Sequence, residues 1–213
     1  MSKDILEVLK GKRKDGTSLK DIFDNRIAAK PEDHVDTIIE GLASSDRNVQ
    51  NGCAELASLV SEKTPDLLIS SLALFVENLS AKEPMLRWEA VCTVGNLAKL
   101  DKKGVIVNQL PTLYGLLNDK SIVLQGHALK ALAKIAHSNP DQAEFILKAI
   151  LDAEDRFPGN RIGFVVEAME VFIENRRFQK KIRTFVHPLA GSAINSVSRK
   201  AKKVLKLLDK LES

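Results

Sequence analysis

The segment LRWEAVCTVGNL at residues 86–97 carries the pattern that predicts the fold. Apolar or small residues stand at offsets 0, 4, 7, 8 and 11 from its first position; they are Leu86, Ala90, Thr93, Val94 and Leu97. At about 100° per residue these offsets fall within one stripe of an α-helix, which predicts a helix with one buried face. The small residue at offset 4 allows a neighbouring helix to come close.

Further segments align with this one without gaps and carry the same offsets. They are VQNGCAELASLV from residue 49, LQGHALKALAKI from residue 124 and VSRKAKKVLKLL from residue 197. Successive starts lie 37, 38 and 73 residues apart, so the last interval is close to two periods. IGFVVEAMEVFI from residue 162 supplies the missing copy, although Glu170 interrupts its stripe at offset 8. Leu42, Leu79 and Leu117 each precede an aligned start by seven residues and are expected to close a preceding helix. A fixed period of this length predicts stacked helix pairs.

The helix-pair period and the pattern of residues 86–97 resemble those of HEAT repeats, over roughly residues 31–211. The positions that match the family's V-R-x-x-A-x-x-x-L-x-x-L style of second helix are Leu86, Arg87, Ala90, Val94 and Leu97. The family's Arg occurs in this copy alone, and the equivalent positions hold Gln50, Gln125, Gly163 and Ser198. The resemblance implies an all-α fold, an α-α superhelix (solenoid) of about five HEAT-like helix pairs.

The first 30 residues do not follow this register. Residues 2–10 and 18–29 have the pattern of two helices joined by a basic loop at 11–16, and such a pair would form an atypical cap over the first repeat. No linker rich in Pro, Gly or Ser interrupts the chain. We therefore expect residues 1–213 to form one domain, with the cap at 1–30 and the repeats at 31–213.

Charge is distributed unevenly along the chain. Residues 1–30 carry a net charge of +3, residues 31–160 carry −6 and residues 161–213 carry +7. An acidic middle between basic ends suggests different partners along the length, or a dipolar rod with a solvated surface.

The second helices also predict a binding surface. If the stripe faces inward, offsets 2, 5, 6, 9 and 13 face the concave side of a HEAT-like stack. The residues that we expect there to contact a partner are Trp88, Leu129, Phe164, Arg199, Lys202, Lys203, Lys206 and Lys210. Exposed aromatic residues are typical interface anchors, and the five cations suit phosphate or an acidic protein. The alternative is that apolar positions such as Val91 and Ala133 pack between repeats and that the last helix is simply solvated.

No enzyme motif is present in the sequence, which lacks GxGxxG, GxxxxGK[ST], GxSxG, HExxH and CxxC. The four histidines, His34, His127, His137 and His187, have no acidic residue at a ligand-like spacing. We expect no catalytic residue, metal site or cofactor. The nearest enzyme alternative that the resemblance implies is the HEAT-like alkylpurine DNA glycosylases, for which Trp88 and Glu167 would be the candidates.

These features predict a non-enzymatic scaffold that binds a protein or peptide through its concave surface. The alternative function is nucleic-acid binding through the basic C-terminal face. Cys53 and Cys92 both lie in apolar-periodic segments, which indicates reduced, buried thiols and a cytoplasmic location. No stretch approaches the roughly 18 apolar residues of a membrane-spanning helix, so no membrane partner is expected.

Overall fold

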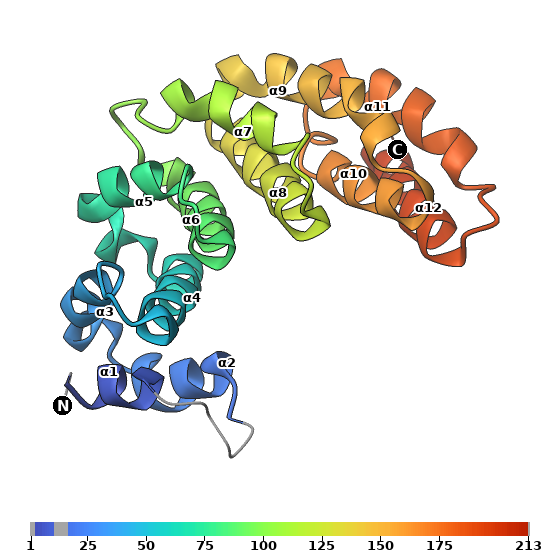
Figure 1. Cartoon of the computed structure of the whole chain (residues 1–213). Coiled ribbons are helices and arrows are strands. Elements are labelled where there is room, and N and C mark those ends of the chain that lie inside the picture. The colour runs from blue at the N-terminus through green and yellow to red at the C-terminus, as the bar shows by residue number, and fades with distance from the viewer. Residues whose placement is uncertain (1–2, 11–16, 213) are drawn as a thin grey trace. The chain divides into compact units, whose positions relative to one another are not determined.

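Helices are the regular elements of this protein throughout residues 3–10 and 17–212, the ranges that the computed structural model describes (Figure 1). The chain divides into two compact units, which are Met1–Gln109 (unit 1) and Leu110–Ser213 (unit 2). The basic loop expected at residues 11–16 lies outside the described residues.

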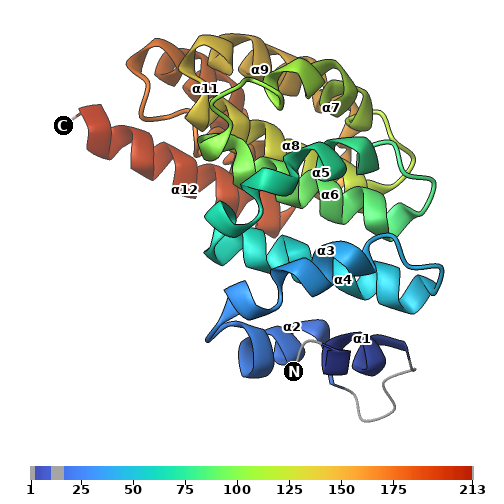
Figure 2. The same cartoon turned by 90° about the vertical axis from the view of Figure 1, so that its left-hand side faces the viewer.

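Unit 1 holds the cap and two helix pairs (Figure 2). Its α-helices are α1 (Lys3–Lys10), α2 (Leu19–Ile22), α3 (Val35–Gly41), α4 (Arg47–Lys63), α5 (Leu72–Asn78) and α6 (Pro84–Leu97). A π-helical turn, η1 (Phe23–Ile27), continues α2. Short 3₁₀ turns connect the rest, at η2 (Pro31–Asp33), η3 (Pro65–Leu67), η4 (Ile69–Ser71), η5 (Ala98–Leu100) and η6 (Val107–Gln109). Both α1 and α2 pack against α4, so the two N-terminal helices cover the first repeat as a cap.

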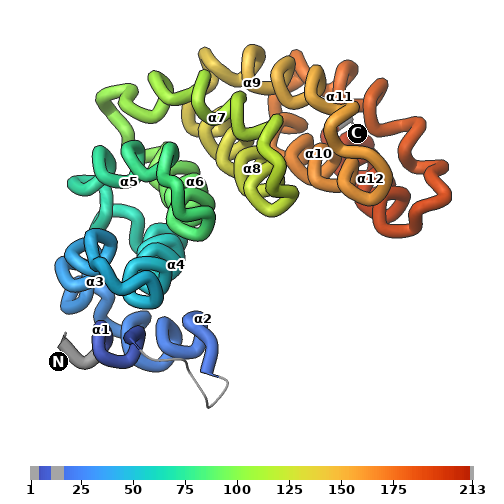
Figure 3. Tube along the Cα trace, viewed as in Figure 1, coloured from blue at the N-terminus to red at the C-terminus, as the bar shows by residue number. Residues whose placement is uncertain are grey.

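Unit 2 holds three helix pairs. Its α-helices are α7 (Leu110–Leu116), α8 (Ile122–Ser138), α9 (Pro140–Asp152), α10 (Ile162–Met169), α11 (Arg176–Leu189) and α12 (Asn195–Glu212), with 3₁₀ turns η7 (Glu154–Arg156) and η8 (Gly159–Arg161). Within this unit α7, α9 and α11 form one layer and α8, α10 and α12 the other (Figure 3). Since α10 packs against both α8 and α12, the second helices lie side by side.

The expected apolar stripes form the core. The stripe residues of the five second helices are buried, except that Ile162 and Glu170 of the fourth copy and Leu205 of the fifth are half-buried. Leu42, Leu79 and Leu117, expected to close the preceding helices, are also buried. The degenerate fourth copy is the short one, because α10 ends at Met169, one residue before the Glu170 that interrupts its stripe. The prediction of helix pairs with a period near 37 residues is confirmed.

Polar residues in the turns fix where the second helices begin. The Asp46 carboxylate accepts hydrogen bonds from the backbone N–H groups of Asn48 (2.8 Å) and Val49 (3.3 Å) at the start of α4. The Ser121 hydroxyl accepts one from Leu124 N–H (3.3 Å) at the start of α8. These contacts satisfy N–H groups that have no partner within the helix.

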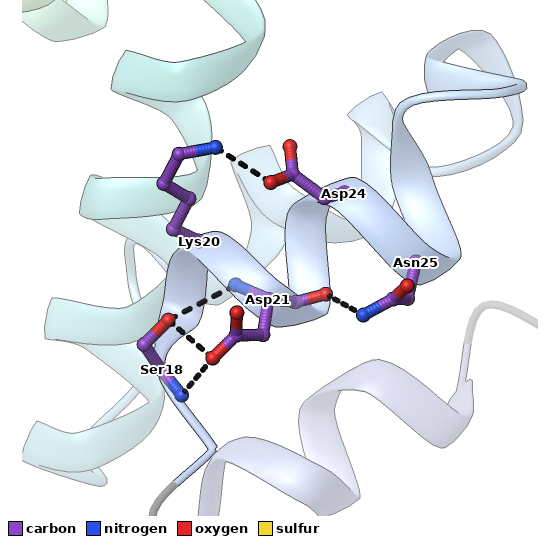
Figure 4. Close-up of polar contacts among 5 residues, drawn as sticks. All are labelled: Ser18, Lys20, Asp21, Asp24 and Asn25. Carbon is purple, nitrogen blue, oxygen red and sulfur yellow. Dashed lines mark hydrogen bonds and ion pairs between the residues drawn. The ribbon is translucent and has the colours of Figure 1, made fainter.

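The cap has its own start signal, which Figure 4 shows. The Ser18 hydroxyl accepts a hydrogen bond from Asp21 N–H (3.0 Å), and the Asp21 carboxylate accepts one from Ser18 N–H (2.9 Å). This reciprocal pair is a capping box. The Asp21 carboxylate also accepts a hydrogen bond from the Ser18 hydroxyl (2.7 Å), and the two bonds that it accepts from Ser18 hold the pKa of Asp21 below its usual value. Lys20 pairs with Asp24, and the Asn25 amide donates to the Asp21 carbonyl oxygen, which tightens the same turn.

In the first, third and fifth pairs, the residue after the stripe start joins the two helices. Gln50 donates to the carbonyl of Leu42 (3.0 Å), Gln125 to that of Asp119 (2.9 Å) and Ser198 to that of Ala190 (2.7 Å). Each acceptor lies at or just beyond the C-terminal end of the first helix, where carbonyl groups lack intrahelical partners. The Gln and Ser residues that stand where HEAT repeats have Arg therefore satisfy these carbonyl groups.

Candidate partner-binding surfaces

The eight residues expected to contact a partner are divided between the units. Trp88 lies on α6 of unit 1. Unit 2 holds the other seven, which are Leu129 on α8, Phe164 on α10, and Arg199, Lys202, Lys203, Lys206 and Lys210 on α12. Trp88 thus lies in one unit and the five cations in the other.

Leu129 does not lie on a surface. Its exposed fraction is 0%, and that of Ala133, one turn further along α8, is 3%. The expectation of an exposed Leu129 was wrong because α8 packs against α7, α9 and α10, so the buried arc of the helix is wider than the stripe that the repeats share. Val91 on α6 is likewise fully buried. For these positions the packing alternative is confirmed.

Trp88 is half-buried and is held by its neighbour. Its indole Nε1–H donates a hydrogen bond to Glu89 Oε1 at 2.6 Å. Burial raises the pKa of the Glu89 carboxyl, opposed by the hydrogen bonds from Trp88 and Ser58, and the negative charge of Glu55 raises it further. An indole therefore lies at the edge of unit 1 beside a carboxylate that is only partly hydrated.

Polar contacts between α4 and α6 extend this region. Asn51 Nδ2 donates to Glu83 Oε1 (3.3 Å), and Arg47 forms an ion pair with the same carboxylate. At the C-terminal end of α6, Asn96 Nδ2 donates to Ser61 Oγ (2.8 Å). The Trp88 surface is defined here as the exposed or half-buried residues of α4 and α6 along this line: Asn51, Glu55, Ser58, Glu62, Trp88, Glu89 and Asn96. It contains three carboxylates, and the exposed Arg47 at its end is already paired with Glu83.

Sequence reasoning identified only part of the Trp88 surface. The offsets expected to face the concave side include Trp88 and also Asn51, Glu55, Ser58 and Glu62. They do not include Glu89 or Asn96. The signal that could have found them is a spacing of seven: Glu89 and Asn96 are seven apart, as are Asn51 and Ser58. Two side chains seven residues apart return to nearly the same face of a helix.

The fluorescence of Trp88, the only tryptophan, should report the protonation of Glu89. Burial raises the pKa of Glu89 above 4.5, the usual value for Glu. As the pH falls, the carboxylate therefore takes up its proton before pH 4.5 is reached and becomes a neutral, weaker hydrogen-bond acceptor. We expect the emission to change with a midpoint above pH 4.5 and the change to disappear in Glu89→Gln. Glu55→Gln should lower the midpoint, since it removes a negative neighbour. A midpoint at or below 4.5, or a transition that persists in Glu89→Gln, would contradict the geometry.

The outer face of α12 carries the basic residues, opposite its buried residues Val197, Ala201, Val204 and Leu208. All five expected cations are exposed. One of them, Lys203, has an acidic partner from another element: its Nζ lies 2.7 and 2.9 Å from the two carboxylate oxygens of Glu170. Glu170, which interrupts the apolar stripe of the fourth copy, thus neutralises Lys203 on α12.

The other four cations of this face form no ion pair with any described residue. They define the α12 cation stripe: Arg199, Lys202, Lys206 and Lys210. Their spacing of three, four and four residues keeps them on one side of the helix, over about 16 Å at 1.5 Å per residue. Together α11 and α12 contain 11 Lys/Arg and two Asp/Glu. Among the described residues, no carboxylate is therefore bound to the stripe.

Phe164 is covered rather than free. The Nζ of Lys200 lies 5.4 Å from the centre of its ring, and the same Nζ forms an ion pair with Glu167 at 3.0 Å. On α8 the ring lies beside Gly126, where an added Cβ would be 4.0 Å from it. Phe164 therefore contributes to the packing of α8, α10 and α12, and its exposed part lies under a cation.

Groups suited to catalysis are few in the described residues. Burial raises the pKa of the Cys53 thiol to about 12 and lowers the pKa of His127, where the charge of Lys130 adds to the effect. Glu167, a candidate in the glycosylase alternative, is engaged by Lys200. In the described ranges no group of three or more His, Cys, Asp and Glu residues is placed to hold a metal ion.

An open pocket of about 590 Å³ lies in unit 2 between the C-terminal end of α9 and α11. Its walls include Leu151, Asp152, Lys180, Lys181 and Phe185, a mixture of apolar, acidic and basic side chains. None of the helices described in the structure is long and apolar enough to cross a membrane.

Comparison with solved structures gives the class of fold. The chain superposes on the designed armadillo repeat protein YIII(Dq)4CqI with a TM-score of 0.65 and 17% identity, covering 98% of this chain and 100% of that one. It matches the designed armadillo repeat protein YIII(Dq.V1)4CPAF, solved in complex with peptide (KR)4, with a TM-score of 0.64 and 16% identity over 97% of this chain and 90% of that one.

A chain from a structure of Kap95p with RanGDP matches at a TM-score of 0.59 and 17% identity, over 97% of this chain and 27% of that one. The protein thus has the fold of the armadillo/HEAT-type helical repeat proteins, as the repeat pattern predicted. No family model and no curated protein matches the chain.

Proposed function

We propose that the protein is a non-enzymatic repeat scaffold that binds a protein partner across its second helices. The observation that carries the proposal is the Trp88 surface, where a half-exposed indole stands among three carboxylates and two asparagine side chains on neighbouring helices. Aromatic anchors surrounded by polar groups that orient a ligand are typical of protein interfaces. A designed repeat protein of the same fold was solved with a peptide, which also supports a peptide-binding role.

The geometry of the surface explains how a scaffold would work. Hydrogen bonds from Asn51 and Asn96 tie α4 to α6 at both ends of the surface, and Glu89 fixes the indole. A partner therefore meets side chains that are already oriented, so that little conformational entropy is lost on binding. The carboxylates of Glu55, Glu62 and Glu89 favour a partner segment with basic residues.

Capture from a nuclease-treated native lysate tests this function. We expect the wild-type protein to retain a protein partner, identified by mass spectrometry, and Trp88→Ala to retain at least tenfold less, as for loss of an interface anchor. Phe145→Ala is the matched control, because it also removes an aromatic ring but from α9, where Phe145 is 66% exposed. Circular dichroism checks that both variants are folded.

Two outcomes of this experiment would contradict the proposal. If Trp88→Ala retains the same partner as the wild type, the Trp88 surface is not the binding site. If a protein is retained from an untreated lysate but not from the nuclease-treated one, it was held through nucleic acid, and the scaffold proposal is wrong.

A further inference from the structure

We propose that the α12 cation stripe binds an acidic helix of the protein partner, through glutamates or aspartates spaced three and four residues apart. This inference rests on the proposed scaffold function and assigns the chemistry of a second contact, in unit 2. The stripe consists of Arg199, Lys202, Lys206 and Lys210, which form no ion pair with any residue that the structure describes.

The contact between α10 and α12 shows how such a helix is recognised. Glu167 pairs with Lys200 at 3.0 Å, and Glu170 pairs with Lys203 at 2.7 Å. The two glutamates are three residues apart, and so are the two lysines. The earlier glutamate pairs with the earlier lysine, and the later glutamate pairs with the later lysine. Two helices that rise 1.5 Å per residue can keep such pairs in register along their length. One side of α12 is thus already occupied by carboxylates of a neighbouring helix.

The outer face of α12 repeats this arrangement without a partner. From Arg199 to Lys210 the four cations follow steps of three, four and four residues, the spacing of one helix face. The same steps in an acidic helix would place one carboxylate opposite each cation. Neighbouring like charges on one face repel each other, and a bound acidic helix removes that repulsion.

Several features favour an acidic helix over a nucleic-acid backbone. The stripe contains no aromatic residue on which a base could stack, and the nearby Phe164 ring is covered by Lys200. Beside the stripe, α12 already binds a carboxylate, because its Lys203 pairs with Glu170, which directly follows the C-terminal end of α10.

The test compares two synthetic helical peptides of equal composition by fluorescence anisotropy at low ionic strength. One peptide carries four glutamates in steps of three, four and four residues, and the other has the same glutamates spread around the helix. We expect the first to bind at least threefold more tightly to the wild-type protein. Equal binding of the two peptides would overturn the proposal, because it would show only diffuse charge attraction.

Two triple variants locate the contact. Lys202→Gln/Lys206→Gln/Lys210→Gln removes three cations of the stripe, and we expect about tenfold weaker binding of the first peptide. Arg176→Gln/Lys180→Gln/Lys181→Gln is the matched control, since it removes the same charge from exposed positions of α11. Its affinity should stay within twofold of the wild type. Equal losses in the two triple variants would contradict the assignment to α12.

Two further measurements separate this proposal from others. Duplex DNA is titrated under the same conditions, and binding that is tighter than that of the first peptide and lost in the α12 variant would overturn the acidic helix in favour of phosphate. In the capture experiment, an α12 variant that retains the Trp88-dependent partner fully would refute this second contact and leave the scaffold function standing. Loss of capture in Trp88→Ala alone therefore does not support the stripe.

Discussion

Phe157→Ala should lower the free energy of unfolding by about 4 kcal/mol, the cost typical of removing a large buried aromatic side chain. Phe157 follows the turn η7 in unit 2 and is 1% exposed, although it belongs to no regular helix. Its N–H donates to the Glu154 carbonyl oxygen at 2.9 Å, which holds the residue in place while its ring fills the core. Urea unfolding followed by circular dichroism measures the loss.

Phe145→Ala is the control for this experiment. The two residues are of the same type and lie in the same unit, but Phe145 is 66% exposed on α9. We expect its replacement to change the free energy of unfolding by less than about 0.5 kcal/mol, as for other surface substitutions. Similar losses in the two variants would show that Phe157 does not serve as a core residue.

The stability of the wild-type protein should fall steeply with pH above 9 because of Cys53. This thiol is fully buried on α4, against Gly41 of α3, where an added methyl group would overlap its Sγ. Burial raises the pKa of Cys53 to about 12 from a usual value of 9.0. Between these values the unfolded chain has lost the proton that the folded chain keeps. The unfolded state is therefore favoured increasingly as the pH rises, by about 1.4 kcal/mol per unit.

The predicted loss attributable to Cys53 is about 1.4 kcal/mol at pH 10 and about 2.7 kcal/mol at pH 11, relative to Cys53→Ala over the same pH range. The comparison between variants is needed because lysine and tyrosine side chains also titrate there. Cys92→Ala is the control, since it removes a thiol and leaves Cys53 in place. If the wild-type protein and Cys53→Ala have the same dependence on pH, the Cys53 thiol is not held protonated by burial.

Much of the fold was predictable because its signals are local. The apolar offsets from Val49, Leu86, Leu124 and Val197 specify which side of each second helix is buried, and the structure buries these sides. Turn residues such as Asp46 act on N–H groups only two or three residues away. The period of the pattern then indicates stacked pairs, since each amphipathic pair needs a neighbour to cover its apolar face.

The candidate surfaces were less predictable. Trp88 and the α12 cations were identified from the projection of helix faces, but the burial of Leu129 was not. A projection of one helix shows which face is most apolar. It does not show how many neighbours the helix has, and α8 has helices on three sides.

By itself, the sequence determined the helix pairs, their buried stripes and the clustering of basic residues on the last two helices, because each depends on spacing along a single helix. Only the tertiary structure decided which charges remain available. Glu170 and Lys203 are 33 residues apart, and their ion pair exists because α10 packs beside α12. The burial of Phe157 and the raised pKa of Cys53 have the same origin, since both depend on atoms that only packing brings near. Contacts between helices therefore separate the stripe, whose four cations form no ion pair with a described residue, from Lys200 and Lys203, which are already paired.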